Sequence, residues 1–417
     1  MSRSYTVQQG DTYETIARRM YGDEQYSQNI AESNPGAPSV PQVGSTLVVP
    51  DVPERDLNEQ RANNDQGITE PDQVTLSVND QVFRFWTDVS ITQHLDAVST
   101  VSFEAPFEPD QQQHRDAFRP YSYQPVRIDV DGDLLFTGTL VNPQPSADVR
   151  ERTMTAACYS VPGVLSDCTP PASSYPLQWD NVTLQTIAAA LCRPFGISVV
   201  FPQGAGQTFE RIAVEPGEKV MDALARLAAQ RNLVIRSDER GRLAFIRPQA
   251  EGVPVAPFTE GQSPVVRITP SFGNQQFYSH VTGITPSIVG LEGDQVTVRN
   301  QHLPGVLRPY TYTAEDMENA DLQQAVQSKA GRMFAQAASY LVDVDTWRNQ
   351  NGDLWRPGDF VTLEYPGAMV YSAYRLQIRS VTLRATQSER TAKLDLIIPG
   401  SLSGQVPEAL PWDVSQG

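Results

Sequence analysis

Long hydrophobic runs are missing from this sequence. No stretch approaches the roughly 20 apolar residues that a membrane-spanning helix needs, and the N-terminal segment MSRSYTVQQG lacks the apolar core of a signal peptide. We therefore expect no membrane partner and synthesis in a cytoplasm, from which something else would move the chain.

Cysteine and histidine are also scarce. The three cysteines form an odd number without CxxC spacing, which argues against a disulfide framework or a cysteine-based metal site and favours buried free thiols. None of the four histidines lies in HExxH or in another motif with metal spacing. We expect structural roles for all seven residues: Cys158, Cys168, Cys192, His94, His114, His280 and His302.

Motifs of catalysis are absent as well. There is no GxSxG elbow, and GAGQTFE at 204–210 lacks the Gly-Lys-Ser/Thr ending of a phosphate-binding loop. DVDGDLL, from Asp129, resembles the start of a calcium loop, but Leu140 stands where the glutamate at the twelfth position would bind the ion. The sequence therefore predicts no enzyme, no catalytic residue, no metal and no cofactor.

Basic residues are outnumbered, 32 against 49 acidic ones, which gives a formal charge of −17. A general nucleic-acid-binding surface would need clustered Lys and Arg. A negatively charged passage, in contrast, lets DNA slide because the phosphates meet no counter-charge. DNA is therefore expected only as a passing partner.

What the sequence does contain is turn-rich β structure. A length of 417 residues predicts three or four domains, and 32 prolines with 27 glycines between short Val/Ile/Thr/Phe runs favour a mainly β chain. Residues 1–50 read as strand, two helices and strand, a βααβ module. Residues 51–72 hold seven acidic and two basic side chains, which predicts a solvated acidic linker.

Two β-rich blocks flank an α/β insert. The first, 73–172, alternates apolar and polar residues, with turns at Asn79-Asp80 and Asp131-Gly132, and suits a small barrel. The insert, 173–250, alternates helices with strands, and Asp180 or Thr183 would cap its first helix. The second block, 251–400, contains four closing strand candidates and one long helix predicted at 321–341. Residues 401–417 form a C-terminal tail that would extend to a neighbour or fray.

Four stretches in the same order resemble one family. They are LFTGTLVNPQPSADVRERTMTAACYSVPGVLSDCTPP, TLQTIAAALCRPFGISVVF, VEPGEKVMDALARLAAQRNLVIRSDERGRLAFIRP, and the closing GDLWRPGDFVTLEY…YRLQIRSVTL…TAKLDLIIPGSL. With them, residues 73–400 resemble the baseplate hub proteins of Mu-like contractile-tail phages, which are related to the hub half of type VI secretion spikes. Each piece alone is a weak signal, and their order makes it strong.

This resemblance implies a partner set and a location. The chain would form a homotrimer whose two tube-like barrels per copy give a pseudo-sixfold ring, between a sixfold tail tube protein and a threefold central spike protein. It would be a virion component of the tail baseplate, made in the host cytoplasm. Aromatic and arginine side chains on ring-facing strands are the subunit-interface candidates, with packing inside their own barrel as the alternative for the aromatic ones: Phe83, Phe85, Trp86, Trp347, Trp355, Arg356 and Arg375.

The opening module is similar to a LysM domain of the tail-associated type, on the elements GDT, IARRMYGD, IAESNP and VGSTLVVP. The resemblance implies contact loops at Gly10, Asp11, Thr12 and at Asn34, Pro35, Gly36. Alternatively, Asp11 caps the first helix and the second loop only ends the second helix. We expect docking on other baseplate proteins, of the wedge or sheath-initiator kind, with contact to peptidoglycan as the alternative.

Two other functions stay open at this point. One is a wall hydrolase at the tail tip, anchored by the LysM module, which would require a catalytic constellation. The other is a type VI secretion spike component with the same hub half. Such spikes usually continue into a C-terminal needle of β-repeats, whereas this sequence stops after GSLSGQVPEALPWDVSQG, which favours a phage-type hub.

Overall fold

The computed structural model consists of two compact units, residues 1–71 and 72–417, which are treated separately below. The residues that it describes are 3–8, 11–21, 27–34, 36, 38, 40–49, 72–83, 86–148, 152–285, 293–313, 319–386 and 388–413. All of the predicted acidic linker except Asp72 lies outside these ranges. Within them no helix is both long and apolar enough to cross a bilayer.

The first unit has the predicted βααβ order. β1 pairs antiparallel with β2, and the two helices pack with this strand pair around a small core that contains Ile16, Ile30 and Leu47. Its elements are β1 Arg3–Thr6, α1 Tyr13–Tyr21, α2 Ser27–Glu32 and β2 Thr46–Val49.

The N-terminal strands of the second unit form a set that we call the first repeat. Alternating apolar residues put one face of each strand into the core, as in Val74–Val78, where every second residue is buried. In the sheet the strands follow the order β3-β7-β8-β9-β6-β5, with the short β4 beyond β3. The elements are β3 Val74–Val78, β4 Gln81–Phe83, β5 Asp88–His94, β6 Thr100–Pro106, α4 Gln112–Ala117, β7 Pro125–Val130, β8 Asp133–Ala147 and β9 Arg152–Ser160.

The C-terminal strands form the second repeat. Their order in the sheet is β15-β21-β22-β23-β20-β16. The elements are β15 Pro254–Thr259, β16 Val265–Phe272, β20 Ala338–Val344, β21 Phe360–Tyr365, β22 Val370–Thr386, β23 Arg390–Ile397 and α8 Gly400–Ser403.

The two repeats share one topology. Numbered along the chain within each repeat, and leaving out β4, the six strands lie side by side as 1-4-5-6-3-2 in both. In both, the long fifth strand carries a bulge against the sixth, at Leu140/Asn142 and at Ile378/Ser380. The first strand differs, since it is antiparallel to the fourth in one repeat and parallel in the other.

A short sequence match follows the sixth strand of each repeat. Residues 162–166 read PGVLS and residues 399–403 read PGSLS, and each segment turns into a short helix. Both glycines are required by close packing: a Cβ on Gly163 would lie 2.3 Å from the Tyr159 ring, and one on Gly400 would lie 2.1 Å from the Gln405 carbonyl oxygen. Letter matching along the whole sequence misses this similarity because it is so short.

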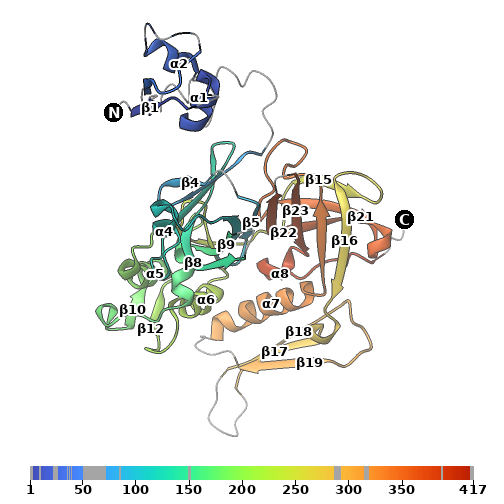
Figure 1. Cartoon of the computed structure of the whole chain (residues 1–417). Helices are drawn as coiled ribbons and strands as arrows, with labels where there is room; N and C mark the ends of the chain where they lie inside the picture. The colour runs from blue at the N-terminus through green and yellow to red at the C-terminus, as the bar shows by residue number, and fades with distance from the viewer. Residues whose placement is uncertain are drawn as a thin grey trace. The chain divides into compact units, whose positions relative to one another are not determined.

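The repeats are joined into one 13-stranded sheet, because β5 pairs antiparallel with β22 from Asp88↔Thr386 to His94↔Ser380. These two strands lie side by side at the centre of Figure 1. One hydrophobic core runs under both repeats, from Val74 to Leu410. The mainly β class is thus confirmed, but the two blocks share a sheet. No backbone pairing between described residues closes either repeat into a barrel.

An α/β domain follows the first repeat and has its own core, in which side chains of its two helices and of β14 meet, among them Ile187, Leu224 and Phe245. Thr183 caps the first of these helices, as one of the two predicted alternatives, with its Oγ1 accepting from Thr186 N at 3.4 Å. The elements are β10 Gln178–Val182, α5 Leu184–Cys192, β11 Val199–Val200, β12 Phe209–Ala213, α6 Val220–Gln230, β13 Val234–Ser237 and β14 Leu243–Ile246.

A three-stranded arm is inserted between β16 and β20, and α7 packs on one of its faces through Val281, Leu322 and Val326 (Figure 1). The helix was predicted at 321–341 but ends at Ala335, because Ala338–Val344 forms β20, which is paired on both sides. The elements are β17 His280–Ile284, β18 Gln295–Arg299, β19 Pro309–Thr313 and α7 Asn319–Ala335. Short 3₁₀ turns are η2 Val161–Ser166, η3 Ala172–Ser174, η4 Arg193–Phe195, η5 Asn274–Gln276 and η6 Pro366–Ala368.

The C-terminal tail packs on its own chain up to Asp413. Leu410 is buried in the main core, and the Trp412 ring lies 5.6 Å from that of Phe272. Neither predicted alternative, an extended arm or a frayed end, describes these residues. Apolar burial of two side chains explains why the segment stays attached.

A substitution at Leu383 tests whether the two repeats share one core at their junction. This residue is buried, lies on β22 and faces Ile91 of β5 across the ladder. Leu383→Ala should lower the free energy of unfolding by about 3 kcal/mol, because a cavity forms where the repeats share their core. Urea unfolding measures this. Leu307→Ala, at a side chain that is 81% exposed, should stay within about 0.5 kcal/mol of the parent; equal losses in both variants would contradict a shared core.

Candidate assembly surfaces

Polar side chains link β5 to β22 on the solvent side of the joined sheet. Arg384 donates to Asp88 at 2.6 Å, and the Thr92 and Thr382 hydroxyls lie 3.0 Å apart. Each contact joins one repeat to the other, so side chains reinforce the backbone ladder.

The bulge on β22 supplies a third link. It displaces Arg379 from the ladder, so that its carbonyl oxygen accepts from Leu95 N at 2.8 Å and its guanidinium contacts Asp96 at 3.0 Å. Asp395 lies 4.0 Å from the same guanidinium. Burial raises the pKa of Asp395, although Arg379 counteracts this. One cation is thus shared by two carboxylates.

His94 stands at the end of this junction, opposite Ser380. Burial lowers the pKa of His94, Asp96 acts in the opposite direction and raises it, and Arg379 lowers it. The junction therefore favours a neutral imidazole.

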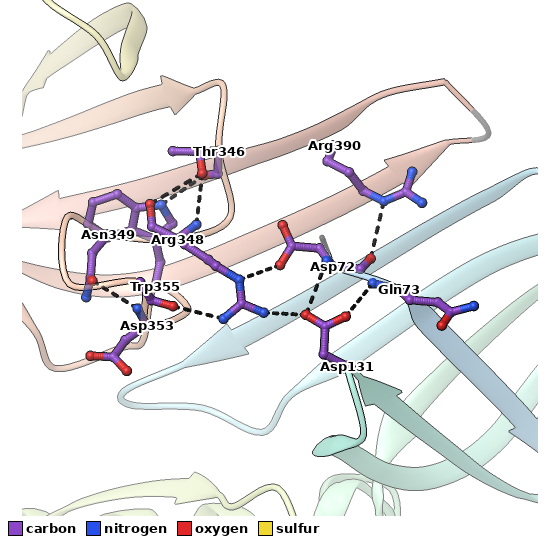
Figure 2. Close-up of polar contacts among 10 residues, drawn as sticks. Asp72, Gln73, Asp131, Thr346, Arg348, Asn349, Asp353, Trp355 and Arg390 are labelled. Carbon is purple, nitrogen blue, oxygen red and sulfur yellow. Dashed lines mark hydrogen bonds and ion pairs between the residues drawn. The ribbon is translucent and has the colours of Figure 1, made fainter. Parts of the chain in front are cut away.

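A second charged cluster holds the start of the second unit in place. Figure 2 shows Arg348, from the connection between β20 and β21, pointing between Asp72 and Asp131. Its Nε donates to Asp72 Oδ1 at 2.7 Å and its Nη2 to Asp131 Oδ2 at 2.5 Å. Asp131 also accepts from the backbone N–H of Asp72 at 3.2 Å and of Gln73 at 2.9 Å. One arginine of the second repeat therefore fixes two segments of the first.

The loop that carries Arg348 is braced by its own hydrogen bonds. Asn349 Oδ1 accepts from the backbone N–H of Asn351 at 2.9 Å and of Asp353 at 3.2 Å, and Trp355 N donates to the Trp347 carbonyl at 3.0 Å. These bonds fold residues 346–355 back on themselves (Figure 2), and the folded loop places the Arg348 guanidinium beside its two carboxylates.

Both predicted interface tryptophans of this loop are buried inside their own chain. Trp347 and Trp355 are 0% and 1% exposed, and their indole N–H groups donate to the carbonyl oxygens of Thr391 at 2.8 Å and Thr346 at 2.9 Å. The alternative considered above, packing in their own sheet, describes this placement, and neither ring offers surface to a neighbour.

The first-repeat aromatic candidates have mixed surroundings. Phe83 is half-buried, with its ring 5.2 Å from that of Phe118. Trp86 is 9% exposed and lies under the Arg390 guanidinium of the second repeat, 5.5 Å from its ring centre. Phe85 lies outside the described residues.

The two arginine candidates are exposed. Arg356 pairs with Glu239 of the α/β domain at 3.6 Å, so it links two parts of one chain. Arg375 lies on β22 and donates to the Gly252 carbonyl at 3.3 Å, at the end of the sheet where β15 begins. The structure does not bring the six described interface candidates together at one place.

In the first unit, the loop side chains expected to make contacts are used internally. Asp11 accepts from Gln8 N and from the Tyr5 hydroxyl, both at 2.8 Å. It does not cap α1, as one alternative expected; Thr12 does, accepting from Thr15 N at 3.2 Å.

The second loop of this unit is tied to β2. Asn34 donates to the carbonyl oxygens of Ile30 at 2.7 Å and Val48 at 2.8 Å, and it accepts from Val48 N at 2.8 Å. Gly36 has φ +102° with open space around it. Gly10 and Pro35 lie outside the described residues. Among the described residues of these loops, the surface near Gly36 remains open.

Among the described residues, the cysteine, histidine and acidic side chains are the candidates for a catalytic or metal site. The cysteines are free, and burial raises the pKa of the Cys192 thiol to about 12, which keeps it protonated. Across the described part of the chain, no three His, Cys, Asp or Glu side chains are placed to hold a metal ion. His302 is bound through Nε2 to the Pro407 carbonyl oxygen at 2.8 Å, a structural contact.

Comparison with known proteins gives two domain matches. Residues 162–247 match the second domain of the baseplate hub protein gp44-like family, and residues 5–50 match the LysM domain. Baseplate hub protein gp44 of Escherichia phage Mu is 23% identical over 308 residues, which cover 70% of this chain and 78% of that protein. Both resemblances expected from the sequence are confirmed.

Solved structures share the fold. The 43 kDa tail protein of prophage MuSo2 from Shewanella oneidensis is 23% identical with a TM-score of 0.69, covering 79% of this chain and 99% of that one. A tail protein from Neisseria meningitidis MC58 is 19% identical with a TM-score of 0.67, covering 81% and 100%. The E. coli type VI secretion component c3393 is 11% identical with a TM-score of 0.50, covering 77% and 76%.

Arg348→Ala should lower the free energy of unfolding by about 2 kcal/mol, because Asp72, whose side chain is 9% exposed, loses its cation. Arg348→Lys should recover part of this loss, since an ammonium restores charge without the two-pronged geometry. Urea unfolding measures both. Arg240→Ala is the matched control on an exposed turn, and a loss there as large as at Arg348 would argue against a special role for the cluster.

The lowered pKa of His94 predicts a pH effect with a definite sign. Its folded-state pKa lies below the unfolded value near 6.5, so the stability contributed by neutral His94 is present above that value and is lost as the pH falls through the folded-state pKa. Between about pH 8 and about pH 5, His94→Gln should lose less thermal stability than the parent. Melting temperatures that fall by the same amount with pH in both proteins would count against this assignment.

Proposed function

We propose that this chain is a structural hub of a contractile-tail baseplate, where it is a component of the virion. Two observations support the proposal: its relation to baseplate hub protein gp44 of phage Mu, and a sheet built from two six-strand repeats with one topology. The similarity to gp44 indicates the class of protein. The two repeats of one topology give a physical reason why such a protein would serve as a hub.

The reason is a symmetry mismatch. In our proposal three copies form a ring, and two repeats per copy present six similar surfaces to a sixfold tail tube, while the threefold axis fits a central spike. Association with tube and spike proteins follows from this role. The β5–β22 junction supports it, because six surfaces remain equivalent only if the two repeats of a copy keep a fixed spacing.

The ring would surround a channel through which DNA passes. The formal charge of −17 favours a lumen with excess carboxylates, past which a polyanion slides without being held. We propose that the LysM unit docks on other baseplate proteins, because Asp11 and Asn34 are occupied by internal bonds.

Two alternatives keep specific support. The LysM match at 5–50 is compatible with peptidoglycan contact, or with a tail-tip wall hydrolase, although no three His, Cys, Asp or Glu side chains of the described residues are placed to hold a metal ion. The fold similarity to c3393 is compatible with a place in a type VI secretion spike. Both would leave the hub geometry of residues 72–413 unchanged.

Sedimentation velocity on the purified chain should give a trimer at micromolar concentration, and removal of residues 1–71 should leave the trimer intact, because the repeats lie in the second unit. A monomer in both cases would contradict the ring. Clearing of peptidoglycan in a zymogram at low protein concentration would replace the hub by the hydrolase alternative.

A further inference from the structure

Within one chain, a connection of the second repeat contacts a turn of the first repeat. Each repeat has the counterpart of the other's contacting element, and these two counterparts are exposed. Within the chain, the connection between the third and fourth strands of the second repeat, residues 345–359, reaches the first repeat. There Arg348 binds Asp72, just before the first strand, and Asp131, in the turn between the fourth and fifth strands. A cation on one repeat thus meets two carboxylates on the other.

The first repeat has the corresponding connection, residues 107–124, and the side chains at its tip point to solvent. Tyr121 and Tyr123 are 89% and 60% exposed. Both hold left-handed backbone conformations, with φ of +60° and +50°, which are unfavourable for bulky residues. Arg119 next to them is exposed as well. Aromatic and arginine side chains are the types enriched at protein interfaces.

The second repeat has the corresponding receiving surface, also exposed. Because β15 runs parallel to β21, the turn between the fourth and fifth strands lies beside the end of the first strand, near the pair Thr259↔Glu364. At this turn Met369 and Tyr371 are 51% and 48% exposed. An acidic residue stands there as well: Glu260, just after the first strand, is exposed and accepts from Gly367 N of the turn at 3.1 Å. Apolar side chains with a carboxylate beside them complement Tyr121, Tyr123 and Arg119.

The backbone pairing of β5 with β22 cannot be repeated between one copy and the next. On β22, Val381 and Leu383 pair with β5. Counted from the two bulges, the matching positions on β8 are Pro143 and Pro145, which lack a backbone N–H. A continuing sheet from one copy to the next would therefore lose donors, which leaves side chains and turns to make the contact.

We infer that the loop Arg119–Tyr123 of one copy docks on the surface around Glu260, Met369 and Tyr371 of the next copy. The inference rests on the proposed trimeric hub, and it assigns the surface by which its copies meet. Three such contacts between copies then alternate with the three Arg348 contacts inside copies, so that at every joint of the ring a connection between a third and a fourth strand meets a turn between a fourth and a fifth strand.

Cross-linking tests the assignment in full-length chains that carry Cys168→Ser, since the other two cysteines are buried. One tagged chain carries Tyr123→Cys and a differently tagged chain carries Met369→Cys; the two are co-expressed and treated with a short bismaleimide. Mixed dimers should form, and the double variant should yield covalent trimers. Tyr175→Cys, 50% exposed on the α/β domain, replaces Tyr123→Cys as the matched control.

Charge reversal gives a second readout that does not depend on cysteine chemistry. Arg119→Glu should weaken self-association about fivefold, as expected for an exposed ion pair, and Glu260→Arg in the same chain should restore it. Arg240→Glu, on an exposed turn of the α/β domain, should leave association unchanged.

The outcomes separate the two proposals. A trimer in sedimentation velocity without cross-linking above the Tyr175→Cys control would overturn this surface and leave the hub function standing. A chain that stays monomeric would overturn both. Cross-linking with rescue of Arg119→Glu by Glu260→Arg would establish the surface.

Discussion

The pairing of β5 with β22 is the interaction on which the rest of the structure depends. Backbone N–H and C=O groups at a sheet edge must find partners or water, and the length of β22 allows it to pair with β21 first and with β5 afterwards. The bulge at Arg379 marks the change of partner and delivers a guanidinium to the carboxylate of Asp96. Because the ladder fixes register as well as distance, it sets one repeat relative to the other and lets a single core run beneath both.

The two repeats differ in the additional elements that accompany their strands. The first is followed by the α/β domain and the second contains the arm with α7, so insertions occur at different points of one topology. The α/β domain is held against the joined sheet at separate places: Ser237 Oγ accepts from Ser99 N at 2.8 Å, and Asn232 donates to the Ser403 carbonyl at 3.1 Å. Polar contacts of this kind are directional, and so they fix an orientation that apolar packing alone would leave free.

In the loop between β20 and β21, buried side chains stabilise the fold and a charged side chain makes the contact with the other repeat. The large indoles of Trp347 and Trp355 stabilise a loop from inside, and the same loop presents Arg348 to two carboxylates. Trp347 and Trp355, which the sequence suggested for contact between copies, thus serve the fold. The exposed tyrosines in the connection before β7 were not among the predicted candidates. What distinguishes them is their backbone conformation, because the positive φ of Tyr121 and Tyr123 cannot be read from a sequence pattern.

The sequence by itself determined the mainly β class, the βααβ module, the turns at Asn79-Asp80 and Asp131-Gly132, and the helices of the α/β domain. These features arise from local periodicity, turn chemistry and capping, which act within a few residues. Tertiary structure decided the end of α7 at Ala335, the joining of both repeats in one sheet and the partners of Arg348. Those depend on residues that lie far apart in the chain, such as Asp72 and Arg348, and their pairing energy exists only once distant strands are brought into register.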